Sequence, residues 1–247
     1  MRRAQFLASA ASTALLLAIT ATSATAETPA PTTSPGPSSS ASAPAASPAT
    51  LTVVKHKKKV TGFTKFTYQT GKVSGIDPKA AAKINKVIAQ DVNRTMLDSM
   101  HAKNYMCSMG LKDCGYFVQT LQAPACKAGN VCITAPSSLL PQGSNTGYSW
   151  VDTWVFDAST GAKKQLKEFV TTSQEASFLT AVKAGITAQL AKGGITNDPN
   201  WKPFVKMKDV YEWLPSADGL HIYFAKYDVA PGSFGVVSVD VPWSAFQ

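Results

Sequence analysis

Residues 213–246 read WLPSADGLHIYFAKYDVAPGSFGVVSVDVPWSAF and have the pattern of a small antiparallel sheet. The Asp218-Gly219 pair is typical of a tight hairpin turn. After the turn, every second residue is apolar and faces a core: Leu220, Ile222 and Phe224. His221 and Tyr223 alternate with these residues and face away. Alternating valines near the end of the stretch repeat the pattern, so it predicts three antiparallel strands with one apolar face.

Two helices are predicted before this stretch. The first begins at Asp77, an N-cap type, and at Pro78, which suits the first helical position. Its apolar residues recur at helical spacing: Ile84, Val87, Ile88, Val92, Met96 and Met100. The second begins near Thr172, which has capping-box spacing to Glu175, and ends at the glycine pair 193–194. Its apolar stripe is Leu179, Val182, Ile186 and Leu190.

Further strands are predicted over residues 62–70, 116–122, 131–136 and 148–156. In the last of them, one face carries Trp150, Asp152, Trp154 and Phe156. Such a row can bind a sugar ring, but aromatic side chains more often pack beneath a helix, which is the interpretation we favour. Together the elements predict a single α+β domain over residues 60–247, with a mixed, mostly antiparallel sheet packed by two main helices.

The N-terminal part has the features of an exported protein. Arg2 and Arg3 precede an apolar run, and small residues precede Glu27, so residues 1–26 are interpreted as a signal peptide whose removal leaves no transmembrane anchor. Residues 27–59 are interpreted as a disordered linker rich in Pro, Ala, Ser and Thr that ends in a basic run, KHKKK. This run can hold anionic polymers, but we favour a solvated, flexible junction, with His56 in solvent.

The cysteines fall close together in the chain: Cys107, Cys114, Cys126 and Cys132. An even, clustered set in an exported protein predicts disulfide bonds. Zinc is the competing interpretation, but the spacing lacks the short Cys-x2-4-Cys pair of structural zinc sites. Three pairings are open, of which the sequential one closes the shortest loops.

The sequence offers no recognisable catalytic centre. The three histidines, His56, His101 and His221, lie far apart, and none has the partner spacing of a metal-dependent hydrolase. Neither a nucleophile elbow nor a glycine-rich phosphate loop is found. We therefore expect no catalytic residues, no metal and no cofactor.

The C-terminal stretch resembles the RsiV-like extracellular domain family. The residues that carry the likeness are Asp218, Gly219, Leu220, Phe224, Tyr227, Ala230, Pro231, Gly235, Val241 and Pro242. Residues 156–169 are similar to that family's D-x-x-T-G strand and turn, and residues 80–88 to its early helix. The family includes lysozyme-sensing ectodomains of anti-sigma factors, modules attached to peptidoglycan deacetylases, and secreted immunogenic mycobacterial proteins. The resemblance implies an exported α+β domain and leaves the function open.

The sequence is compatible with two functions. The first is a secreted or cell-wall-associated, non-catalytic binding protein. Its partner would be either another protein, such as a lysozyme-like protein, or an anionic cell-wall polymer. The second is an enzyme or accessory module that acts on the cell wall through an unrecognised site. Nucleic acid is not expected as a partner of an exported chain. The expected binding residues are Asn145 and Tyr148, from a polar loop at 141–148, with His221 and Tyr223 on the outer face of the C-terminal strands. A mobile connection without a partner is the alternative for that loop.

Overall fold

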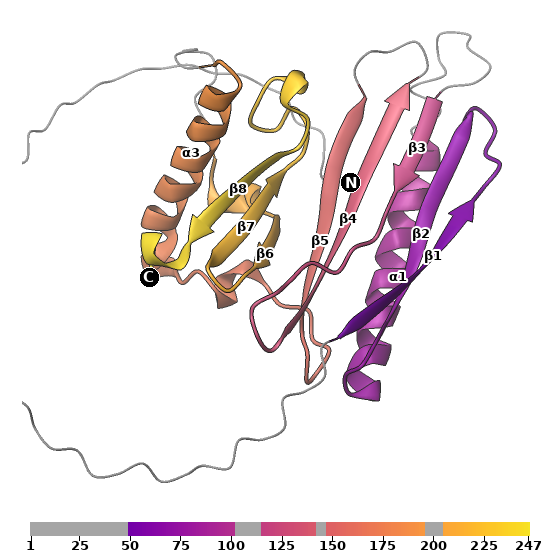
Figure 1. The fold of residues 1–247 in the computed structure, drawn as a ribbon, viewed down its shortest axis with the longest axis horizontal. Helices are drawn as coiled ribbons and strands as arrows, with labels where there is room; N and C mark the ends of the chain where they lie inside the picture. The colour runs from indigo at the N-terminus through magenta and orange to yellow at the C-terminus, as the bar shows by residue number, and fades with distance from the viewer. Residues whose placement is uncertain (1–48, 102–114, 142–146, 196–204) are drawn as a thin grey trace, which may run out of the picture. The chain divides into compact units, whose positions relative to one another are not determined.

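The computed structural model describes residues 49–101, 115–141, 147–195 and 205–247. They form two β-sheets and two α-helices, which confirms the predicted α+β class. The first sheet has the strand order β1-β2-β3-β4-β5 and the second the order β6-β7-β8 (Figure 1). The elements are β1 Thr50–Lys57, β2 Lys65–Ser74, α1 Pro78–His101, β3 Gly115–Gln119, β4 Asn130–Pro141, β5 Tyr148–Asp157, α3 Glu175–Lys192, β6 Glu212–Pro215, β7 Gly219–Phe224 and β8 Val237–Pro242.

Helix α1 covers one face of the first sheet, in which only the β2–β3 pair is parallel. The helix begins as predicted, because the Asp77 carboxylate accepts hydrogen bonds from the backbone N–H groups of Lys79 and Ala80, both at 2.9 Å. Its predicted apolar residues Ile84, Ile88, Val92 and Met96 are buried. In the described part of the chain, no helix combines the length and the apolar character that a membrane span needs.

The aromatic row of β5 packs beneath α1, as favoured from the sequence. Trp154 and Phe156 are buried in one cluster with Ile84 and Ile88 of the helix. The Trp154 indole Nε1 also donates a 2.7 Å hydrogen bond to the Asp91 carboxylate on α1. Because these rings are covered, this row is not an open sugar-binding platform.

Helix α3 covers one face of the second sheet, where its buried side chains meet those of β8. The start of this helix corrects the sequence prediction, which paired Thr172 with Glu175. The capping box is formed one residue earlier, by Thr171 and Gln174, because a 3-10 turn over Thr172–Gln174 precedes the α-helix. The buried stripe accordingly includes Phe178 in place of Leu179, which is only partly buried.

Strand β1 is the largest departure from the predicted organisation. Residues 50–57 were assigned to the linker and its basic junction, whereas the structure pairs every one of them with β2 in an unbroken antiparallel register. His56 is accordingly not simply solvated: its ring stacks on Tyr68, and Nε2 lies 2.8 Å from the Thr70 hydroxyl. The physical reason is that Val and Thr at 50–54 favour a strand, and the lysines that follow can project from its exposed sides.

The two sheets lie side by side through β5 and β6 (Figure 1). No strand pairing joins these two strands among the described residues, and side chains make the link instead. A second link is the hydrogen bond, 2.9 Å long, that the Lys226 backbone N–H donates to the Ser149 carbonyl.

Candidate functional site

His221 and Tyr223 lie on the face of β7 opposite the α3 side, as the alternation predicted. His221 pairs with Asp240 across the β7–β8 ladder, and its Nδ1 contacts the Asp240 carboxylate. Both side chains are exposed, so this is a solvated cross-strand pair of a kind that contributes little to stability. Burial raises the pKa of the half-buried Tyr223 hydroxyl, and the negative charge of Asp240 adds to the effect.

Among the described residues, this face carries one His–Asp pair and no complete catalytic triad. A Ser-His-Asp type of triad requires a nucleophile hydrogen-bonded to the second ring nitrogen of the histidine. Within the described residues, no hydroxyl is hydrogen-bonded to the His221 ring, and no three His, Cys, Asp or Glu side chains are grouped so as to hold a metal ion. The His221–Asp240 pair can therefore offer a ligand hydrogen bonds and charge, but the described residues do not complete a reaction site around it.

The predicted binding loop is only partly within the described structure, since Asn145 lies outside it. Tyr148, the other residue expected there, is the first residue of β5. Its ring lies 5.5 Å from that of Trp150, and it packs against the cluster of Phe66 and Phe117. Tyr148 is therefore half-buried against this cluster at the start of β5, whereas His221 and Tyr223 lie on β7.

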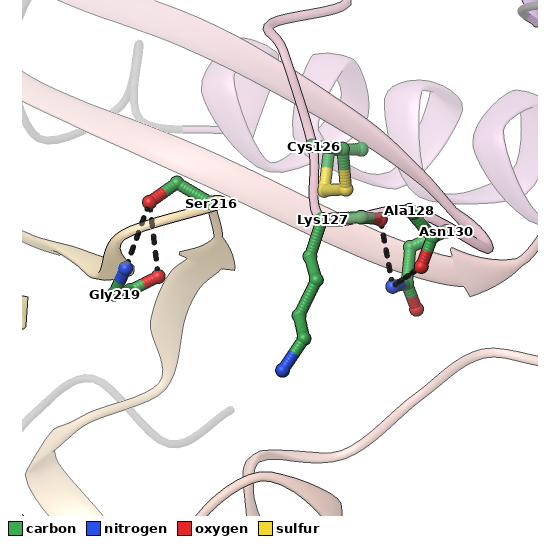
Figure 2. The surroundings of a disulfide bond; sticks show 7 residues. Cys126, Lys127, Ala128, Asn130, Ser216 and Gly219 are labelled. Atoms are coloured by element: carbon green, nitrogen blue, oxygen red, sulfur yellow. Dashed lines mark hydrogen bonds between the residues drawn. A yellow bond between two sulfur atoms is a disulfide. The ribbon is translucent and has the colours of Figure 1, made fainter. Parts of the chain in front are cut away.

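One predicted disulfide is present, between Cys126 and Cys132, and Figure 2 shows its surroundings. It matches the sequential pairing, whose other bond, Cys107–Cys114, lies outside the described residues. The Lys127 backbone N–H donates a 2.9 Å hydrogen bond to the Pro215 carbonyl of β6, and the Lys127 ammonium lies 4.1 Å from the centre of the Trp243 ring. The disulfide-closed segment thus connects the β3–β4 side of the molecule to the second sheet.

The D-x-x-T-G motif, residues 157–161, also has an architectural role. The Asp157 carboxylate accepts hydrogen bonds from the backbone and side chains of Ser159 and Thr160. These bonds, led by that of the Ser159 hydroxyl, hold the pKa of Asp157 well below its usual range. Gly161 has a φ of 69°, and a Cβ there would lie 2.5 Å from the Ala80 carbonyl oxygen, so only glycine lets the turn approach the start of α1.

The most strongly charged described surface is the β1–β2 hairpin. We call residues 50–74 the basic hairpin, because this segment contains no Asp or Glu. It carries six exposed lysines: Lys55, Lys57, Lys58, Lys59, Lys65 and Lys72. None of them forms a salt bridge with a carboxylate of the described residues. The hairpin therefore presents uncompensated positive charge at one end of the first sheet.

Only part of this surface can be recognised from the sequence. The run at residues 55–59 is visible in the sequence, whereas strand pairing, and not sequence distance, places Lys65 and Lys72 on the same hairpin. The missed signal was the Thr-Leu-Thr-Val-Val sequence at 50–54, whose β-branched residues are typical of strands. Asp240 was also missed as the partner of His221, since cross-strand register cannot be read from one strand alone.

Comparisons with known proteins find a matching family and solved structures of similar fold, and none of them has a stated function. Residues 156–244 match the family described as "Protein of unknown function (DUF3298)", so the match runs from the end of β5 through α3 and the second sheet. No curated protein is matched by the chain.

Two solved structures have a similar fold. One is a DUF3298 family protein from Pseudomonas aeruginosa PAO1, with a TM-score of 0.54. The other is a DUF3298 family member from Bacteroides fragilis NCTC 9343, with a TM-score of 0.53. Each is 13% identical in sequence, and each alignment covers 81% of this chain and 92% of the other. At this identity the likeness is one of fold alone.

Proposed function

We propose that this protein is an exported, non-catalytic domain that binds an acidic protein at the cell envelope through the basic hairpin. The observation that carries the proposal is the hairpin itself, with six exposed lysines and no carboxylate. Such a surface attracts acidic partners, raises the rate of association and makes the binding sensitive to salt.

Export is supported by the signal-like N-terminus and by the Cys126–Cys132 disulfide. Disulfides are typical of proteins that fold in oxidising compartments. A protein as partner is supported by the resemblance to the RsiV-like family, whose sensor members bind a protein. The resemblance is a finer assignment than the DUF3298 match, and we adopt it as part of this proposal.

An anionic cell-wall polymer is the second candidate partner, and the same lysine charge favours it. The two candidates differ in what they require of the surface. A flexible polyanion needs only positive charge, whereas a protein partner also needs a defined shape and backbone geometry.

The test compares capture by two matched variants of the mature chain. In the hairpin variant, four exposed lysines are changed to Gln: Lys55, Lys57, Lys59 and Lys65. In the control variant, four exposed lysines elsewhere are changed to Gln: Lys79, Lys86, Lys167 and Lys208. Immobilised chains are incubated with envelope extract at low and high salt, and bound proteins and polymers are analysed separately.

We expect the wild type and the control variant to retain the same acidic protein at low salt and the hairpin variant to lose it. An equal loss of binding by both variants would show that net charge, and not this surface, governs capture. Retention of wall polymer without protein would favour the second candidate. Release of soluble fragments from labelled peptidoglycan by the wild type would contradict the non-catalytic part of the proposal.

A further inference from the structure

The outward backbone groups of β1 can be assigned from one hydrogen bond. The Lys58 N–H donates to the Phe66 carbonyl at 2.9 Å, in register with the β1–β2 ladder. In an antiparallel ladder, hydrogen-bonded pairs alternate with pairs that are not hydrogen-bonded. Even-numbered residues of β1 therefore bond to β2, and the odd-numbered residues direct their N–H and C=O groups away from the sheet: Leu51, Val53, Lys55 and Lys57.

This outer edge lacks most of the features that usually prevent strand addition. Edge strands are commonly short, or interrupted by a bulge or proline. Strand β1 has eight residues in continuous register with β2 and contains no proline. Val53 and Val54 are 41% and 54% exposed, on opposite faces, which leaves apolar surface for an added strand to cover on both sides.

A shallow groove of about 390 Å³ lies on the even-numbered face of the hairpin, over the β1–β2 pairs. It is lined by Thr52, Val54, Thr70, Gly71, Lys72 and Ser74. An added strand would place the side chain opposite Val54 on this same face, next to the groove. Small hydroxyl-bearing side chains and a glycine make room there for a β-branched residue.

The charges along this edge determine which kind of polypeptide segment can pair with it. Lys55 and Lys57 project from the odd-numbered face, on which Lys65 of β2 also lies. A second copy of the chain would bring another six-lysine hairpin to the same place, which like-charge repulsion disfavours. The chain's own residues 27–48 contain a single acidic residue, Glu27, and six prolines, so they match neither the lysines nor the backbone edge.

We propose that the outer edge of β1 binds an extended acidic segment of a partner protein, which adds to the first sheet as a further strand. This inference rests on the proposed function and specifies how the basic hairpin recognises its partner. Backbone hydrogen bonds to the odd-numbered residues supply the pairing. Carboxylates opposite Lys55 and Lys57, with apolar residues opposite Val53 and Val54, select the sequence.

The probe is an acetylated, dye-labelled peptide, Glu-Thr-Glu-Val-Val-Thr-Val, designed to lie antiparallel to residues 51–57. Its glutamates lie opposite Lys57 and Lys55, and its central valines lie opposite Val54 and Val53. N-methylation of the third and fifth residues removes the N–H groups that face β1. N-methylation of the fourth residue removes an N–H group that faces away, and this peptide is the matched control.

The protein variants separate backbone pairing from charge. Val53→Pro removes only an outward N–H group and leaves both the ladder to β2 and the lysines in place, whereas Val53→Thr retains the N–H group in a strand-compatible residue. We expect the full mature chain and Val53→Thr to bind the probe, and Val53→Pro to bind it at least about tenfold more weakly. The peptide methylated at its third and fifth residues should also lose binding, and the control peptide should retain it. Circular dichroism melts establish that both variants are folded.

Equal binding by Val53→Pro and Val53→Thr, or loss with both methylated peptides alike, would overturn strand addition. The hairpin could still bind acidic proteins, since the lysine variants test that separately. No binding of the probe by the wild type would also overturn the inference. A wild-type dimer that Val53→Pro converts to a monomer would show that a second copy occupies this edge instead of an acidic partner.

Discussion

The Glu212 carboxylate accepts two hydrogen bonds from Thr153, one from the backbone N–H at 2.6 Å and one from the hydroxyl at 3.0 Å. The same hydroxyl accepts a 3.0 Å bond from the Trp213 backbone N–H. Thr153 is on β5 and Glu212 on β6, so these bonds join the two sheets where the described residues form no backbone ladder. One hydroxyl and one carboxylate thus replace strand pairing at the junction.

Replacement of Thr153 tests this junction. Thr153→Val keeps the shape of the side chain but removes the hydroxyl, which leaves the Trp213 N–H without its acceptor. We expect the free energy of unfolding to fall by about 1–3 kcal/mol, measured by urea denaturation. Thr153→Ser retains the hydroxyl, so its free energy of unfolding should fall by less. Equal stability of the Val and Ser variants would contradict a role for the hydroxyl.

The lowered pKa of Asp157 predicts how the stability of the fold depends on pH. Its pKa is lower in the folded protein than in the unfolded chain, so the unfolded state binds the proton first and the carboxylate stabilises the fold above about pH 4. This contribution is lost as the pH falls through the folded-state value. We expect Asp157→Asn to be less stable than the wild type at pH 7, and the difference to shrink as the pH falls below about 4.

The measurement for Asp157 is the free energy of unfolding as a function of pH, with Asp218→Asn as the control. Asp218 is an exposed turn residue whose side chain is the same size and charge. A constant difference between Asp157→Asn and the wild type across the whole range would contradict the proposed hydrogen-bonded carboxylate.

The sequence predicted those elements whose pattern is local. The α1 cap at Asp77, the aromatic row of β5 and the alternation around His221 all follow from spacing along one segment. The structure departs from the predictions where contacts between segments far apart in the sequence determine which elements form. Strand β1 forms because β2 pairs with it, and residues 55–57 alone look like a solvated charge run. The side-chain bonds of Thr153 that join the two sheets also have no sequence signature.

Gln119 is a buried polar residue whose replacement should stabilise the protein. Its side chain is 1% exposed, and neither its amide nitrogen nor its oxygen has a hydrogen-bond partner among the described residues. Burying polar groups in this way is costly, so Gln119→Leu should raise the free energy of unfolding by about 1–2 kcal/mol. The exposed Gln122→Leu is the control and should change it little. A destabilised Gln119→Leu variant would show that the amide has a structural role.

The disulfide-closed segment should stabilise the contact between the β3–β4 side and the second sheet. Replacement of Cys126 and Cys132 together by Ser should cost about 2–3 kcal/mol in unfolding free energy. Amide exchange at Lys127 should also accelerate, because its hydrogen bond to the Pro215 carbonyl depends on the position of this segment. Unchanged exchange at Lys127 would show that the contact forms without the disulfide.

Amide hydrogen exchange of the mature chain, with and without poly-L-glutamate at low salt, measures whether the basic hairpin is the binding surface. We predict that protection increases over residues 50–74, that high salt reverses it, and that the four-lysine hairpin variant lacks it while the matched control variant retains it. Protection centred on the His221 and Tyr223 face, or spread evenly over the domain in both variants, would contradict the claim.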